Sequence, residues 1–254
     1  MRRPSRAQPL VVALAALLAL SACSSQRQTQ FGARMEKASR INAQLGAEYL
    51  RNDMLSMAKE KLDKSLEQNP DNADAHATYA LLNMRLDEPE QARDHFEAAL
   101  EERPDDPQLL NNYGTFLCEQ GDHEAGVERF LEAAENPLYK TPAYAYANAG
   151  RCARAAGNAG EAREYLRKAL SADKRMASAL YDLAQLEYEQ GRPSSAKRYI
   201  DRYHDVATVA PESLWLAIRI ERRLGNRSAA DEYGKRLVRK WPDSTQADRF
   251  LETR

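Results

Sequence analysis

The sequence predicts an all-α fold, a right-handed solenoid of paired helices, on two observations. The 254-residue chain is dominated by alanine, leucine, glutamate and arginine, and its 43% hydrophobic content suffices for a sizeable core. Marker residues also recur at intervals of 34 positions, as at Pro70 and Pro104 or at Gly157, Gly191 and Gly225. A unit of that length cannot bury its apolar face alone, so successive units are expected to stack.

This interval is the tetratricopeptide (TPR) period, in which each unit consists of two helices. Counting from the marker residues gives six repeats followed by a short C-terminal capping helix at 245–254. The repeats are 39–72, 73–106, 107–140, 143–176, 177–210 and 211–244. Only Thr141–Pro142 interrupts the count.

Each repeat should hold its two helices together through residues at fixed places. The eighth and twentieth places are small, which allows close approach, whereas the seventh and twenty-fourth are large and fill the seam, as at Leu45 and Phe130. Glycine at the fifteenth place ends the first helix in four repeats. In the sixth repeat, Ile218 and Gly234 invert the small and large places.

The N-terminus predicts export. Three arginines precede an apolar run at 10–20 that is too short to span a membrane as a helix, and Leu20-Ser21-Ala22-Cys23 follows this run. The tetrapeptide resembles the lipobox of bacterial lipoproteins, which implies that 1–22 is a cleaved signal peptide and that Cys23 carries a covalent lipid. The alternative is an ordinary signal peptide with an accidental cysteine.

The residues after the lipobox predict where the protein is sorted. Ser24 rather than aspartate follows Cys23, so the resemblance to bacterial lipoproteins implies the inner leaflet of the outer membrane, facing the periplasm. Residues 23–38 are expected to form a lipidated N-terminus and a flexible tether, because the stretch after Cys23 is rich in serine, glutamine, arginine and threonine.

Charge and motifs argue against catalysis. The net charge is -1, and removal of the three signal-peptide arginines leaves about -4, which gives no basis for nucleic-acid binding. The four histidines fall in different repeats, and metal-protease, phosphate-loop and nucleophile-elbow motifs are absent from the sequence. We therefore expect no catalytic site, no metal, no cofactor beyond the lipid, and no small-molecule substrate.

A partner-binding groove is expected on the concave side of the first two repeats. Places two, five, nine, twelve and thirteen of the first helix face that side in this fold. They predict a shallow apolar trough formed by Ala43, Ala47, Leu50, Arg51, Ala77, Leu81 and Met84. The alternative is that Leu50, Leu81 and Met84 are ordinary packing residues.

Two further regions of the sequence are distinguished by their charge. Repeats four and six present five arginines, and repeats four to six place aromatic residues beside them: Arg151, Arg154, Arg219, Arg222 and Arg223 with Tyr144, Tyr181, Tyr188 and Trp215. Residues 71–140 instead carry 17 acidic and 5 basic side chains, a net charge of -12. We expect a strongly negative convex surface there, which argues against docking on anionic lipid.

Two sequence strings carry a resemblance to a known family. NNYGTFLCEQGDHEAGVERF at 111–130 and NPLYKTPAYAYANAGRCARAAG at 136–157, together with the lipobox and six repeats, resemble the PilF/PilW pilotins of type IV pilus biogenesis. The resemblance implies a non-catalytic outer-membrane lipoprotein that binds the secretin subunit of the pilus and promotes its localisation and assembly. The alternative is another periplasmic TPR lipoprotein, a scaffold for β-barrel assembly or cell-wall enzymes.

The two remaining cysteines are expected to form a disulfide. Cys118 is the twelfth residue of repeat three and Cys152 the tenth of repeat four, so neighbouring first helices place them about 3 Å apart in axial rise. An exported protein lives in an oxidising compartment, which favours pairing. The competing interpretation is two buried thiols that serve as small apolar residues.

Overall fold

The computed structural model describes the backbone of residues 8–253 and the side chains of residues 30–253. Within these residues it contains thirteen helices and no strand, which confirms the all-α class. The helices are α1 (Gln8–Arg51), α2 (Leu55–Gln68), α3 (Ala73–Leu86), α4 (Pro89–Glu102), α5 (Pro107–Glu119), α6 (His123–Glu135), α7 (Pro142–Ala155), α8 (Ala159–Ala172), α9 (Ala177–Glu189), α10 (Pro193–Val206), α11 (Pro211–Arg223), α12 (Arg227–Lys240) and α13 (Thr245–Glu252). Among the described residues, none of these helices is both long and apolar enough to cross a membrane.

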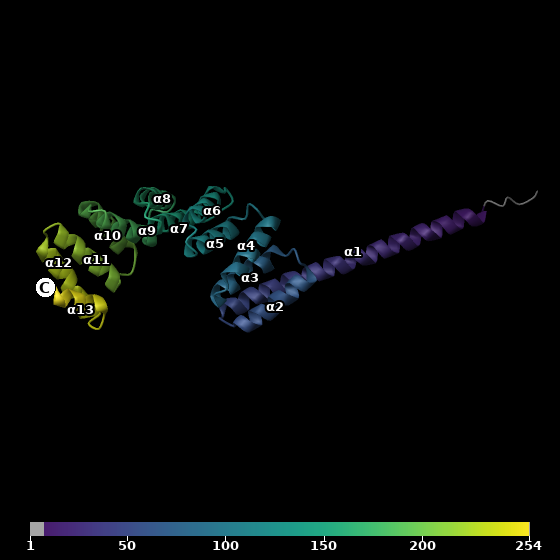
Figure 1. Ribbon diagram of the computed structural model, residues 1–254, viewed down its shortest axis with the longest axis horizontal. Coiled ribbons are helices and arrows are strands. Elements are labelled where there is room, and N and C mark those ends of the chain that lie inside the picture. Colours follow the sequence, from purple (N-terminus) through teal and green to yellow (C-terminus); the bar gives the residue numbers. More distant parts are fainter. Residues whose placement is uncertain (1–7, 254) are drawn as a thin grey trace, which may run out of the picture. The chain divides into compact units, whose positions relative to one another are not determined.

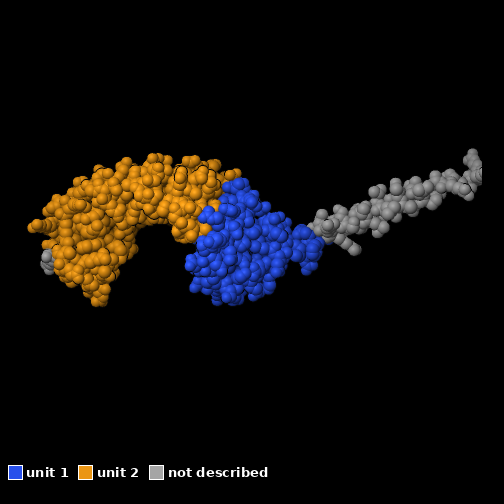
Figure 2. Space-filling view, viewed as in Figure 1, with its two compact units in different colours: residues 1–104 blue, residues 105–254 orange. Residues whose placement is uncertain are grey.

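The chain divides into two compact units, coloured separately in Figure 2. Unit 1 comprises Met1–Pro104 and unit 2 comprises Asp105–Arg254. In unit 1, α1 pairs with α2 and α3 pairs with α4, while α3 also packs on α1 and α2 (Figure 1). The core of unit 1 gathers Leu62, Ala75 and Leu82, which are fully buried, around the junction of the two helix pairs.

Unit 2 repeats the same arrangement four times. The pairs α5/α6, α7/α8, α9/α10 and α11/α12 follow one another in a curved row, and α13 packs on α11 and α12 (Figure 1). The large seam residues predicted from the sequence, such as Phe130, Leu166 and Ile200, are at most 2% exposed. Burial of side chains of this size stabilises a fold by about 1.5–3 kcal/mol each.

Small residues let the paired helices approach. A Cβ added to Gly150 would lie 2.7 Å from Cγ of Leu166, and one added to Gly114 would lie 3.0 Å from the carbonyl oxygen of Gly126. Both distances are too short for ordinary van der Waals contact. Alanine at these eighth places would therefore require the Leu166 side chain or the facing helix to shift.

The turn between the two helices of each repeat requires a left-handed residue at the fifteenth place. Gly121 has φ 87°, and the other three predicted glycines are likewise positive. Repeats one and two carry aspartate at this place, and Asp53 and Asp87 adopt φ 57° and 59°. Aspartate tolerates this conformation better than most side chains but less well than glycine.

One expectation about the N-terminal region differs from the structure. Residues 23–38 were expected to be a flexible tether, but they lie inside α1, which continues N-terminally from the first repeat. Each added residue gains one helical hydrogen bond, and no proline interrupts this stretch, so its polar composition does not by itself end the helix. The side chain of Cys23 and the signal peptide 1–22 lie outside the residues whose side chains are described.

The inversion in repeat six has a physical explanation. The ring of Phe250 in α13 occupies the space that a Cβ at Gly234 would need. Ile218, at the normally small place, is fully buried in the same cluster as Phe250 and Leu237. The capping helix thus supplies the large side chain that the twenty-fourth place of this repeat lacks.

Candidate partner-binding surfaces

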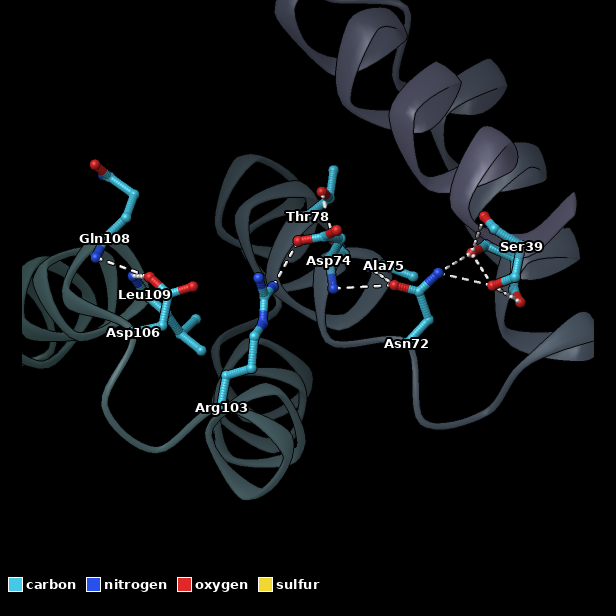
Figure 3. Close-up of polar contacts among 10 residues, drawn as sticks. Ser39, Asn72, Asp74, Ala75, Thr78, Arg103, Asp106, Gln108 and Leu109 are labelled. Carbon is cyan, nitrogen blue, oxygen red and sulfur yellow. Dashed lines mark hydrogen bonds and ion pairs between the residues drawn. The ribbon is translucent and has the colours of Figure 1, made fainter. Parts of the chain in front are cut away.

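A buried polar network fixes the first helix pair of unit 1 to the start of α3 (Figure 3). Each hydroxyl of Ser39 and Ser65 donates to the carbonyl oxygen of the other residue at 2.8 Å. The Asn72 amide nitrogen donates to the Ser39 Oγ at 2.7 Å and to the Ser65 Oγ at 3.2 Å. The Asn72 oxygen accepts from the backbone N–H groups of Asp74 and Ala75, which caps α3. All three partners in the network are buried, so it sets the position of α1 and α3 rigidly.

The predicted trough on α1 and α3 is narrower than expected. Ala43 and Leu50 are only 2% and 8% exposed and belong to the core of unit 1, so the packing interpretation holds for Leu50, and Ala43 is likewise closed to a partner. Leu81 is half-buried and packs against the same core. The accessible part of the trough consists of Ala47, Ala77 and Met84, which are half-buried, with Arg51 exposed at its edge. The reason is that the α1–α3 contact covers the inner side of α1.

The first repeat instead exposes apolar side chains on its outer end. Ile41 is 48% and Leu45 37% exposed on α1, and Met57 is 43% exposed on α2. Ile41 occupies the third place and Leu45 the seventh, and the residues at these places are buried in all five later repeats: Ala75, Tyr79, Leu109, Tyr113, Ala145, Ala149, Ala179, Leu183, Ser213 and Ala217. We name Ile41, Leu45 and Met57 the end face.

Tyr79 shows how a later repeat covers the seventh place, through contacts with the preceding repeat that the end face does not have. At the seventh place of repeat two, its hydroxyl donates to Asp63 at 2.8 Å and accepts from Lys59 at 2.6 Å, both on the second helix of the preceding repeat. Burial raises the pKa of Tyr79, because the ionised form would lose its water. Leu45 was expected to fill a seam, but within unit 1 no described helix precedes α1 to cover it. The position of repeat one in the array is the signal that would have revealed this.

Two histidines, His76 on α3 and His95 on α4, contact each other within the second helix pair. His95 stacks on Tyr79, with ring centroids 4.4 Å apart, and its Nδ1 lies 2.8 Å from Nδ1 of His76. Nε2 of His76 lies 2.8 Å from the Pro70 carbonyl oxygen and must donate to it, so His76 Nδ1 accepts and His95 Nδ1 donates when both rings are neutral. Burial, followed by the charge of His76, lowers the pKa of His95 to about 4.

The basic and aromatic residues of unit 2 are largely engaged with one another. Arg219 and Arg223 lie over the ring of Tyr188, at 4.4 and 5.2 Å from its centroid. Arg151 pairs with Asp182 at 3.1 Å. Burial raises the pKa of Asp182, with Arg151 acting in the opposite direction. Of the aromatic set, Tyr144 remains well exposed. This region therefore offers fewer free cations than the sequence suggested.

The predicted cysteine pair lies where α5 and α7 meet. Cys118 and Cys152 are joined as a disulfide, with their Cα atoms 5.8 Å apart, a separation that disulfides prefer. Sγ of Cys152 would lie 3.3 Å from a Cβ at Gly126, so the bridge also borders α6. Among the described residues, no group of three or more histidines, cysteines, aspartates or glutamates is arranged to hold a metal ion.

The paired helices, the left-handed fifteenth place and the stacked seams define a tetratricopeptide-repeat protein. Models of this repeat match residues 49–111 and 153–211, and a second model matches 95–128. The type IV pilus assembly protein PilF of Pseudomonas aeruginosa is 32% identical over 207 residues, which covers 82% of each chain. The chain belongs to the PilF/PilW family of type IV pilus biogenesis proteins.

Solved structures agree with this assignment. The structure of Pseudomonas aeruginosa PilF has a TM-score of 0.74 at 31% identity and covers 87% of this chain and 99% of that one. PilW, described as a widely conserved type IV pilus biogenesis factor, has a TM-score of 0.76 at 31% identity and covers 84% and 98%. An uncharacterised protein of Haemophilus influenzae is 29% identical over 133 residues, which covers 52% of this chain and 73% of that one.

Proposed function

We propose that this chain is a non-catalytic lipoprotein of the outer membrane that binds the secretin subunit of the type IV pilus and promotes its localisation and assembly. The lipid on Cys23 holds it at the periplasmic side of the membrane. Family membership supports a role in pilus biogenesis. The lipobox supports the anchor, since the multiply acylated cysteine expected of a lipobox holds far more firmly than one acyl chain.

The end face is the observation that carries the binding proposal. Ile41 and Leu45 stand at places that are buried in every later repeat, and the accessible part of the trough lies on α1 and α3 of the same unit. An apolar segment of the secretin that covers the end face removes roughly half of each side chain from water. At about 25 cal/mol per Å² this contributes on the order of 1 kcal/mol for each.

Charge introduced on the end face should weaken secretin binding and spare the fold. We expect Leu45→Glu to weaken secretin binding about tenfold or more, because a carboxylate must lose its water on docking. Met84→Glu tests the trough in the same way. Leu138→Glu is the matched control, since Leu138 is 82% exposed and lies in unit 2. The readout is the secretin recovered with outer-membrane fractions, with helicity of each variant checked by circular dichroism.

Different outcomes test the lipid anchor, the binding surface and the identity of the partner. Cys23→Ala should release the chain from the outer membrane in cells that lack the secretin, and continued fractionation with it would contradict the anchor. If Leu45→Glu and Met84→Glu both fold and both sustain normal secretin levels, neither surface binds it. Crosslinking that recovers β-barrel assembly components or cell-wall enzymes in place of the secretin would favour the alternative TPR scaffold.

A further inference from the structure

A second surface lies between the second helices of repeats three and four, wholly within unit 2. A groove of about 1100 Å³ runs between α6 and α8. Val127, Leu131 and Tyr165 form its half-buried floor, together with Ala153. Its volume slightly exceeds that of ordinary small-molecule pockets. A groove between two helices can accommodate several side chains of a bound polypeptide.

The repeat register explains why this groove is open. At the next junction, the twenty-first place of repeat four and the eleventh and sixteenth places of repeat five hold Arg163, Glu187 and Arg192. Nε of each arginine lies 2.6 Å from the Glu187 carboxylate, which is 2% exposed. An ion cluster around a buried carboxylate thus fills the space between these repeats.

The last junction is filled in the same way. Lys197 and Asn226 contact Glu221 at 2.8 and 2.7 Å, and the groove beside them measures only about 320 Å³. At the junction of repeats three and four, the same three places hold Val127, Ala153 and Asn158. Two small or apolar side chains replace the ion pair, and the disulfide joins the first helices instead.

The rim of the groove determines the charge of its occupant. Asp122, Glu124, Glu128 and Glu161 line it, and none of its described lining residues is a lysine or an arginine. Nearby cations are engaged: Arg129 pairs with Glu128 and Glu132, at 3.0 and 2.7 Å, and Lys168 pairs with Glu164 at 3.0 Å. The groove therefore combines an apolar floor with an acidic edge.

We propose that the α6–α8 groove is a docking site for a basic segment of a partner protein, whose apolar side chains cover Val127 and Leu131 and whose lysines or arginines face Glu124 and Glu161. The acidic edge repels anionic lipid and nucleic acid, so a polypeptide fits it best. This site lies in unit 2, apart from the end face, and it does not depend on the identity of the pilus partner.

Binding of a defined peptide tests the site. The probe is a short fluorescein-labelled peptide of leucine and lysine, mixed with the full-length chain in zwitterionic detergent, with micelles alone as the blank. We expect fluorescence anisotropy to show saturable binding that Glu124→Lys with Glu161→Lys weakens about tenfold. The matched control is Glu119→Lys with Glu135→Lys, an equal charge change at exposed positions outside the groove, which should leave binding within about twofold.

A second variant separates the groove from general charge attraction. Val127→Arg with Ala153→Glu copies the ion pair of the next junction, fills the groove and leaves the net charge unchanged. It should keep native helicity and lose peptide binding. Retained binding in this folded variant, equal weakening by both charge-reversed pairs, or no binding to the unaltered chain would each overturn the proposal. A peptide with serine in place of leucine should bind about tenfold more weakly, and equal binding would exclude the apolar floor.

Discussion

Replacement of Asn72 should destabilise unit 1, because this buried side chain makes four hydrogen bonds. Asn72→Ala removes the two hydrogen bonds that cap α3 and the two that its amide donates to Ser39 and Ser65. Loss of a cap costs about 1 kcal/mol, and each buried hydrogen bond contributes about 0.5–1.5 kcal/mol. The serine hydroxyls still donate to each other's carbonyl oxygens, so neither hydroxyl loses its acceptor, and the cost comes from the cap and from the two amide hydrogen bonds. We expect a loss of about 2–3 kcal/mol.

The assay is urea unfolding followed by circular dichroism. With a slope of about 2–3 kcal/mol per molar urea, the midpoint of the unit 1 transition should fall by about 1 M. Trp215 and Trp241 both lie in unit 2, so tryptophan fluorescence follows that unit separately. Asn72→Ser should recover about 1 kcal/mol by restoring the cap without reaching the serines.

The matched control for this prediction is Asn158→Ala. Asn158 precedes α8 but its side chain makes no capping hydrogen bond, so the cost should stay below about 0.5 kcal/mol. Equal losses for Asn72→Ala and Asn158→Ala would refute the assignment of the stability to the Ser39–Ser65–Asn72 network.

Three further predictions concern other features. Asp87→Gly should raise the free energy of unfolding by about 0.5 kcal/mol, because Asp87 has φ 59°, and an unchanged urea midpoint would contradict this. Replacing both Cys118 and Cys152 by serine should lower it by about 3–4 kcal/mol, since the bond closes a separation of 34 residues, and thiol titration of the denatured, unreduced Cys23→Ala chain should find no free thiol. Because the pKa of His95 falls from 6.5 to about 4 on folding, unfolded chains bind the proton first, so stability is full above pH 6.5 and declines as pH falls toward 4. Screening limits that loss to about 1–2 kcal/mol, and His95→Phe should flatten the pH profile over this window.

The sequence predicted the positions of the helices better than it predicted which of their side chains are exposed to solvent. The 34-residue spacing placed every helix pair, because glycine, proline and small residues act locally at fixed places. It did not predict that Leu45 is exposed, and it left the burial of Leu50 open, since both depend on which neighbouring repeat covers α1. The left-handed aspartates also escaped notice, because aspartate is common outside such turns. The α6–α8 groove emerges only when equivalent places of successive repeats are compared.

The contact between Gly234 and Phe250 bears on how far the sixth repeat extends as a folding unit. By sequence period that repeat ends at residue 244, yet the side chain that completes its seam comes from α13. A chain shortened to residue 244 would keep six full periods and leave a phenyl-sized hole beside Ile218 and Leu237. Truncations and fusions should therefore be made beyond Phe250, because the sequence repeat and the folded unit end at different residues.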